Sequence, residues 1–203
     1  GKWTLRAFQK ENPGHELGCT SQFGTIYGDR FYIVSKQEKD PGATVIGSRL
    51  AVIDAKTMKV LKEFTRIGDS DGRSFLGVDE HTGYIGTSNG IFLYDIDKME
   101  IGEKITGTEN TSGSLYSAQI GTMIRVGDRV FAVHQKDGLL VIDAKTHTLE
   151  TTILKPEEHE GHGLGSIVLS KDGTIWASPT VELTGTGASL PLIWKVDPTT
   201  LTV

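Results

Sequence analysis

The chain has 203 residues, with 21 basic and 26 acidic side chains and a net charge of −5. This balance argues against a protein that binds nucleic-acid phosphates, which usually carries a basic face. Hydrophobic residues make up 37%, enough for a core, but the apolar runs fall far short of the roughly 20 residues of a membrane-spanning helix. A single cysteine, Cys19, excludes an internal disulfide framework.

Four units follow one another along the chain, and each contains the same pattern of an apolar strand, an aspartate and a short turn. The aspartates are Asp54, Asp95, Asp143 and Asp197, spaced by 41, 48 and 54 residues. An aspartate that opens a turn accepts hydrogen bonds from backbone N–H groups two or three residues later. We therefore expect these four side chains to be structural rather than catalytic.

A second repeat precedes each aspartate and predicts a hairpin of two short strands around a Gly/Asp turn. It covers residues 24–34, 121–133 and 165–177, with a weaker copy at 78–86. Each unit therefore contains four strands, and the predicted units span 21–65, 73–106, 118–154 and 162–203. Almost no helix is expected, since no segment shows a sustained 3.6-residue apolar period.

Tandem four-stranded units of 40 to 50 residues are typical of a β-propeller, in which each unit is one blade. A β-sandwich has similar turn signals but lacks this longer period. The sequence therefore predicts an all-β propeller domain over residues 1–203, with about four blades. A strand is also expected over residues 2–8, either as the outer strand of another blade or as a strand that closes the ring. Of these two alternatives, we favour a chain that forms part of a longer propeller.

The turn sequence Val-Ile-Asp-Ala-Lys-Thr, at residues 52–57 and again at 141–146, resembles the blades of surface-layer-type, YVTN/YncE-like propellers. More narrowly, the whole chain resembles the BtuG-like propeller lipoproteins that gut Bacteroidetes display on their outer membrane. The resemblance implies a seven-bladed ring that captures a corrinoid, such as cobalamin, for a TonB-dependent transporter. It also implies a location at the cell surface or outer membrane, with the periplasm as the alternative, and a leader and lipid anchor outside this sequence.

Polar residues precede the first strand of each unit, where the loops of a propeller converge on its central channel. Alignment of the four hairpins places Gln22, Arg73, Gln119 and His162 at the channel mouth, and the preceding loops add His15 and Tyr116. Donors and acceptors around a concave mouth are what a ligand site requires. The alternative is that these groups only bind water.

Two further sets of residues have structural and functional interpretations. His159 and His162 have the spacing of a metal-binding pair, but a stable zinc site needs three or four ligands, so no protein-bound metal is expected. The imidazoles of His15 and His162 are alternatively contacts for a corrinoid. The tryptophans Trp3, Trp176 and Trp194 fall in predicted strands, and we expect them in the core between blades.

From these residues we expect a propeller that binds rather than catalyses, without a cofactor and without a nucleic-acid partner. Three hypotheses remain open. The first is a cell-surface ligand-binding protein, with a corrinoid as ligand; the second is a scaffold that docks a protein or polymer. The third is an extracellular hydrolase or lyase, which would need two carboxylates close together on one face.

Overall fold

The computed structural model describes residues 1, 3–109, 120–182 and 185–203, and its strands form four antiparallel sheets. Blade 1 contains β1 (Cys19–Tyr27), β2 (Arg30–Gln37), β3 (Leu50–Asp54) and β4 (Val60–Phe64). Blade 2 contains β5 (Gly72–Gly77), β6 (Thr82–Thr87), β7 (Gly90–Asp95) and β8 (Glu100–Lys104). Blade 3 contains β9 (Ile120–Val126), β10 (Arg129–His134), β11 (Gly138–Asp143) and β12 (Thr148–Ile153). Blade 4 contains β13 (His162–Leu169), β14 (Ile175–Glu182) and β15 (Trp194–Val196).

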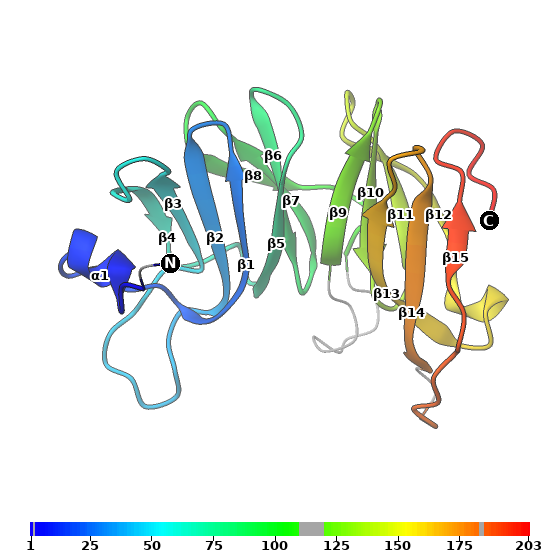
Figure 1. Ribbon diagram of the computed structural model, residues 1–203, viewed down its shortest axis with the longest axis horizontal. Helices are drawn as coiled ribbons and strands as arrows, with labels where there is room; N and C mark the ends of the chain where they lie inside the picture. The colour runs from blue at the N-terminus through cyan, green and yellow to red at the C-terminus, as the bar shows by residue number, and fades with distance from the viewer. Residues whose placement is uncertain (2, 110–119, 183–184) are drawn as a thin grey trace.

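The strands of each blade are hydrogen-bonded in chain order, and consecutive blades pack side by side in an arc (Figure 1). Strand β5 packs against β1 and β2, β9 against β5 and β6, and β13 against β9 and β10. Blades 1 and 4 lie at opposite ends of the arc. The predicted all-β propeller of four blades is thus confirmed, with three strands in the last sheet of the described residues.

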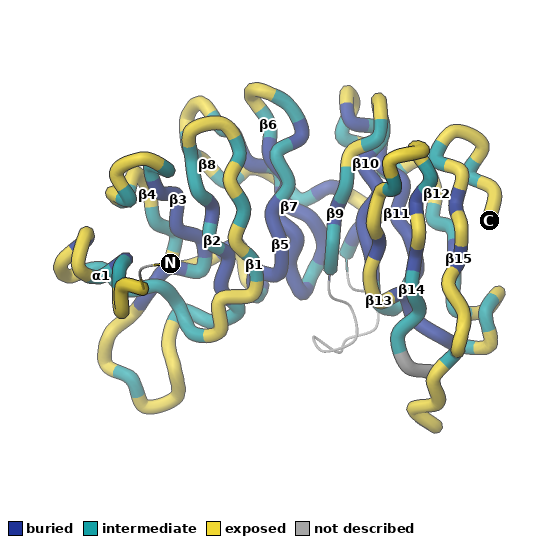
Figure 2. Tube along the Cα trace, viewed as in Figure 1, coloured by how far each residue is buried: buried dark blue, intermediate teal, exposed yellow. Residues whose placement is uncertain are grey.

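Hydrophobic cores fill the spaces between neighbouring blades, as Figure 2 shows by the buried segments along the middle strands. Between blades 1 and 2 the ring of Tyr32 stacks on Phe75 at 4.0 Å and meets Tyr94 edge-on at 5.9 Å. Such aromatic pairs stabilise a core beyond the burial of their area. Apolar side chains that are buried between neighbouring blades therefore hold the arc together.

The segment for which a strand was expected, residues 2–8, contains the start of helix α1 (Ala7–Glu11) instead, and the described residues before it are not in a strand. Its apolar residues do not share one face: Trp3 is 95% exposed, whereas Phe8 is buried against Ala51 and Ile53 of blade 1. Asn12 then fixes the helix to the blade, since its side chain accepts from Val60 N and donates to a backbone carbonyl. The segment covers blade 1 and does not reach blade 4 (Figure 1).

The expectation for the tryptophans is correct for one residue and wrong for two. Trp194 is buried in the core between blades 3 and 4. Trp3 lies outside any core, and Trp176 is 39% exposed because it points to the free face of blade 4. Strand periodicity identifies the face on which a side chain lies but not whether another element covers that face.

The four turn aspartates have the structural role that the sequence predicts. Asp143 Oδ1 accepts from the backbone N–H groups of Lys145 and Thr146, at 2.8 and 2.7 Å, and the other three accept from their own turns in the same way. These hydrogen bonds, that of Thr146 first, lower the pKa of the Asp143 carboxyl. Among the described residues, neither α1 nor the short 3₁₀ helix η1 (Pro156–Glu158) has the length and apolar character of a membrane span.

Candidate functional site at the mouth end

The first strands β1, β5, β9 and β13 all begin at the same end of the arc, the lower one in Figure 1, which we call the mouth end. Every one of these strands contains a β-bulge within its first few residues. A bulge leaves one residue unpaired and changes the direction of its side chain, and bulges are enriched beside functional sites. The opposite end, where the aspartate turns lie, is called the turn end below.

The bulges place Gln22 and Arg73 at equivalent positions. Gln22 lies between Ser21 and Phe23, which pair with consecutive residues of β2, and Arg73 lies in the same relation to β6. The sequence contains no signal for either bulge, so the exact register of the two residues comes from the structure. Both residues lie at the mouth end.

Their surroundings differ because only Arg73 has a blade on either side. Gln22 is exposed, whereas the Arg73 side chain is only 5% exposed. Gly72 permits this burial: a Cβ added there would come within 2.4 Å of Val34 Cγ1 in blade 1. Because Gly72 has no side chain, β5 can approach blade 1 closely, and Arg73 then lies in the junction between the two blades.

Arg73 shares one carboxylate with a second arginine that sequence reasoning did not find. Asp71 lies 3.7 Å from Arg73 Nη2 and 3.9 Å from Arg49 Nη2, while Arg49 Nη1 donates to the Ser70 carbonyl at 2.6 Å. The Nε atoms of both arginines are buried and have no hydrogen-bond partner. Burial lowers the pKa of the Arg73 guanidinium, and the charge of Asp71 opposes this shift.

The cluster of Arg49, Asp71 and Arg73 carries two positive charges and one negative charge, in a protein whose net charge is −5. Buried charges are normally paired and fully hydrogen-bonded, because each loses its hydration. Two guanidinium groups with free N–H donors match the planar, bidentate geometry of a carboxylate or phosphate. The arrangement is therefore suited to an anionic group. Its only signal in the sequence is the Asp-Gly-Arg sequence at the start of β5.

His162 also lies at the mouth end and is buried, but both of its ring nitrogens face backbone carbonyls. Nδ1 lies 3.2 Å from the oxygen of His159, and Nε2 lies 3.1 Å from that of Ala188. A neutral imidazole can donate only one of these hydrogen bonds. Because both nitrogens point to acceptors, neither offers a free lone pair to a metal. His159 packs instead on the ring of Trp194, at 4.7 Å.

His15 lies away from the channel, and this corrects its expected position. Its Nδ1 is 2.6 Å from Glu63 Oε2 on β4, the outermost strand of blade 1. The loop before β1 follows the outside of the blade, because α1 anchors it there. Gln119 and Tyr116, the remaining two predicted residues, lie outside the described part of the chain.

A third buried basic group at the mouth end is His134, the last residue of β10, which was not predicted. Its Nδ1 accepts from the backbone N–H of Asp137 at 3.0 Å, so Nε2 carries the proton. This buried Nε2 makes no hydrogen bond, although it lies 3.4 Å from Asp137 Oδ2. Burial lowers the pKa of the His134 imidazole. Beside it, Lys136, Asp137, Lys155 and Glu157 help to line an open pocket of about 630 Å³.

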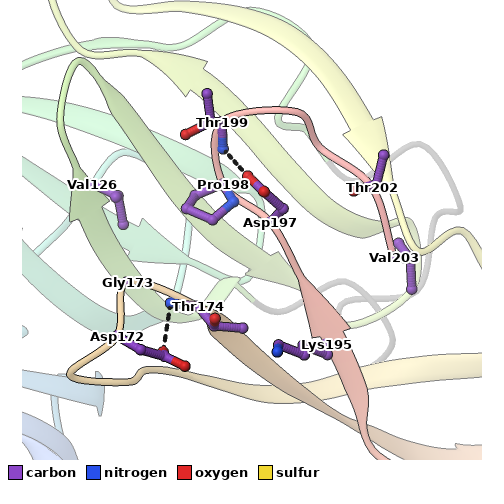
Figure 3. Close-up of a pocket in the computed structure, with 10 residues that line it drawn as sticks. All are labelled: Val126, Asp172, Gly173, Thr174, Lys195, Asp197, Pro198, Thr199, Thr202 and Val203. Carbon is purple, nitrogen blue, oxygen red and sulfur yellow. Dashed lines mark hydrogen bonds between the residues drawn. The ribbon is translucent and has the colours of Figure 1, made fainter.

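A second open pocket, of about 560 Å³, lies at the turn end beside the end of β9 (Figure 3). Asp172 and Asp197 line it, but each carboxylate already accepts a backbone N–H, from Thr174 and Thr199. The hydrogen bond from Thr174 lowers the pKa of the Asp172 carboxyl, and those from Thr200 and then Thr199 lower the pKa of the Asp197 carboxyl. Both carboxylates already accept hydrogen bonds within their own turns. The mouth end, in contrast, contains buried N–H donors without a hydrogen-bond partner.

Solved structures with very different sequences share this fold. The designed protein Ika8 matches with a TM-score of 0.58 and 12% identity over 88% of this chain and 46% of its own. The designed protein Ika4 matches with a TM-score of 0.58 and 11% identity over 89% of this chain and 97% of its own.

A natural match is the extracellular domain of the hybrid two component system BT3049 from B. thetaiotaomicron. Its TM-score is 0.50 and its identity 15%, over 77% of this chain and 18% of that domain. The chain thus spans less than half of Ika8 and less than a fifth of the BT3049 domain. At such identities the likeness concerns the fold alone. No curated protein is similar to this chain in sequence. One family matches residues 1–203, so the chain belongs to the family described as Domain of unknown function (DUF5074).

Proposed function

We propose that this chain is a non-enzymatic ligand-binding propeller of the cell surface, and that its ligand binds at the mouth end. The observation that supports this is the pair of the partly buried Arg49 and the buried Arg73, which share one carboxylate and whose Nε–H donors have no partner. The turn aspartates favour binding over hydrolysis, because each stabilises its own turn in a separate blade. A propeller fold suits such a scaffold, and propellers serve many functions.

The proposed ligand is a corrinoid, on the strength of the resemblance to BtuG-like propellers. Cyanocobalamin combines an amide-rich ring with one phosphodiester, and this anion is a suitable partner for two guanidinium groups. A TonB-dependent outer-membrane receptor is the corresponding protein partner. The location at the cell surface belongs to the same proposal.

Calorimetric titration with cyanocobalamin and cobinamide tests the ligand, with haem as the control for flat, anionic tetrapyrroles. One-to-one binding of the corrinoids and no binding of haem is expected. Cobinamide lacks the nucleotide and its phosphodiester, so its affinity should be lower. A flat trace for both corrinoids on a folded protein would refute the corrinoid and leave a docking scaffold, to be identified by pull-down.

Substitution of Arg73 by Met tests the place of binding. If Arg73 contacts the phosphodiester, the variant loses roughly tenfold or more in affinity for cyanocobalamin and little for cobinamide. The matched control is Arg30→Met, which replaces a largely buried arginine of blade 1 at the turn end. Equal losses in both variants would place the ligand elsewhere.

A further inference from the structure

A groove of about 500 Å³ lies on the outer rim of the arc, at the junction between blades 1 and 2. Its walls come from β4 and the residues after it in blade 1, and from β7 and β8 in blade 2. We call it the rim groove and define it by Lys62, Phe64, Arg66, Phe92, Met99 and Ile101. It shares no residue with the cluster of Arg49, Asp71 and Arg73 at the mouth end.

The floor of the rim groove is apolar. Phe64 is half-buried, and Phe92 is 9% exposed. Gly68 leaves the edge of the Phe92 ring open, since a Cβ added to this glycine would come within 2.8 Å of the ring atom Cζ. Met99 and Ile101 are partly buried against the same core and continue the floor. The groove can therefore hold an apolar side chain.

Three cations surround this floor. Lys62 Nζ lies 5.8 Å from the centre of the Phe64 ring, and Lys104 Nζ lies 5.2 Å from the centre of the Phe92 ring. Arg66 is exposed and lines the groove itself. Within the described part of the chain, none of the three cations lies within 4.0 Å of a carboxylate oxygen. Their charges are thus available to a partner.

The nearby acidic side chains do not neutralise these cations. Glu63, which follows Lys62 in the chain, accepts a hydrogen bond from Ser48 and lies 2.6 Å from His15. Glu100 lines the groove. Three cations and this one carboxylate give a local charge of +2, in a chain whose net charge is −5. The rim groove therefore complements an acidic partner.

Blade 3 shows that the fold does not require these side chains. At the four positions in the same register, it has a threonine in place of each lysine and an aliphatic residue in place of each ring. They are Thr151 for Lys62, Ile153 for Phe64, Leu140 for Phe92 and Thr152 for Lys104. Blade 3 packs against both of its neighbours with these residues in place. The rings and lysines at the rim groove are thus additions to a scaffold that folds without them.

The groove suits a protein segment better than an anionic polysaccharide. Sugars stack on open aromatic faces, whereas here a lysine lies over each ring. Met99 and Ile101 offer an aliphatic surface, and a methionine side chain adapts to the shape of a partner. Strands β4 and β8 are also the outermost strands of their sheets. An extended peptide can pair with the unpaired backbone groups of such an edge, whereas a sugar chain has no regular backbone to match.

We infer that the rim groove binds an extended segment of another protein, in which acidic residues flank an apolar side chain. The apolar side chain lies on the floor at Phe92 and Met99, and the acidic residues face Lys62 and Arg66. Complementary charges of this kind steer the encounter and make it sensitive to salt. This contact does not depend on a ligand at the mouth end.

Fluorescence anisotropy on the full chain tests the inference with a set of labelled decapeptides. Each probe has one leucine flanked by glutamates, and the spacing between them differs from probe to probe. One control set has lysine in place of every glutamate, and a second has serine in place of the leucine. At least one acidic probe should bind with a Kd below about 100 μM and weaken as salt is raised, and both control sets should bind more weakly. Equal binding of acidic and basic probes, or no binding of any acidic probe, would overturn the inference.

Substitutions then test the place of binding. The double variant Lys62→Glu with Arg66→Glu should weaken binding of the acidic probe at least about tenfold, because it sets like charges opposite each other. Lys171→Glu, at an exposed lysine of blade 4, is the matched control and should bind like the wild type. An unchanged affinity in the double variant would refute the site. Binding of polygalacturonate where all acidic peptides fail would assign the groove to a polysaccharide instead. Circular dichroism verifies that each variant is folded.

Discussion

Arg129 of blade 3 donates from Nη1 to the backbone carbonyl of Pro198 in blade 4, at 3.2 Å, and to that of Thr199 at 3.1 Å. Arg30 has the same register in blade 1 and donates to the Ile96 carbonyl in blade 2. In both cases the residue that opens the second strand holds the aspartate turn of the next blade. The turn end of the arc is thus joined by polar contacts above the apolar cores.

Replacing Arg129 by Met should lower the free energy of unfolding by about 1–2 kcal/mol, because two hydrogen bonds to carbonyls from a charged donor are lost, together with the partly exposed ion pair between Arg129 Nε and Glu150 at 3.0 Å. Urea denaturation measures the change. Lys145→Met is the control, since its 2.7 Å ion pair with Asp128 is exposed at both ends and should contribute nothing measurable. Equal effects of the two substitutions would contradict a structural role for the contact between blades.

At the junction between blades 2 and 3, a hydrogen bond between two side chains joins the neighbouring blades. The Tyr84 hydroxyl lies 2.8 Å from His147 Nδ1, and burial raises the pKa of this phenol. A double-mutant cycle of Tyr84→Phe and His147→Ala should give a coupling energy of about 1 kcal/mol. Additive effects of the two substitutions would show that the hydrogen bond does not contribute.

The aspartate turns make the fold sensitive to acid. Hydrogen bonds from Thr146 and its counterparts hold the pKa of Asp54, Asp95, Asp143 and Asp197 below the usual value of about 4. A lowered pKa in the folded state means that these carboxylates stabilise the protein above about pH 4 and lose that effect as the pH falls through the folded value. The Tm should therefore fall steeply below about pH 4.

Asp143→Asn isolates this effect, because the amide keeps an acceptor oxygen but has no charge to lose. Its Tm should lie below that of the wild type at pH 7, and the two should converge toward pH 2 to 3. Glu158→Gln, at an exposed glutamate of η1, is the control and should follow the wild type at every pH. A constant Tm difference across this range would argue against the carboxylate.

Arg73 should serve binding at the expense of stability. Its burial leaves Nε without a partner, and Arg49 alone would balance the charge of Asp71. Arg73→Met should therefore leave the free energy of unfolding unchanged or raise it by up to about 1–2 kcal/mol. Urea denaturation measures this, and a loss of more than about 2 kcal/mol would mean that Arg73 is a structural residue.

Much of the fold can be read from the sequence because propeller blades are local structures. The Asp54 and Asp143 turns depend on residues no more than three positions away, and each hairpin joins neighbouring strands. Such short-range signals repeat with the blade and are visible without the fold. The candidate site was less predictable: Arg73 and His162 lie at the mouth end, but Arg49 joins Asp71 and Arg73 only across the junction of two blades.

The sequence by itself determined the strands, the aspartate turns and the four-blade repeat, since hydrogen bonds within each blade set all three. Only the tertiary structure decided which faces are covered. Nothing near Trp176 distinguishes it from Tyr32 or Phe131, because the exposure of each ring depends on whether another blade packs over it. The sequence likewise does not show that a bulge and a glycine carry Arg73 into a junction. Burial is set by what packs from a distance, whereas periodicity records only the direction in which a side chain points.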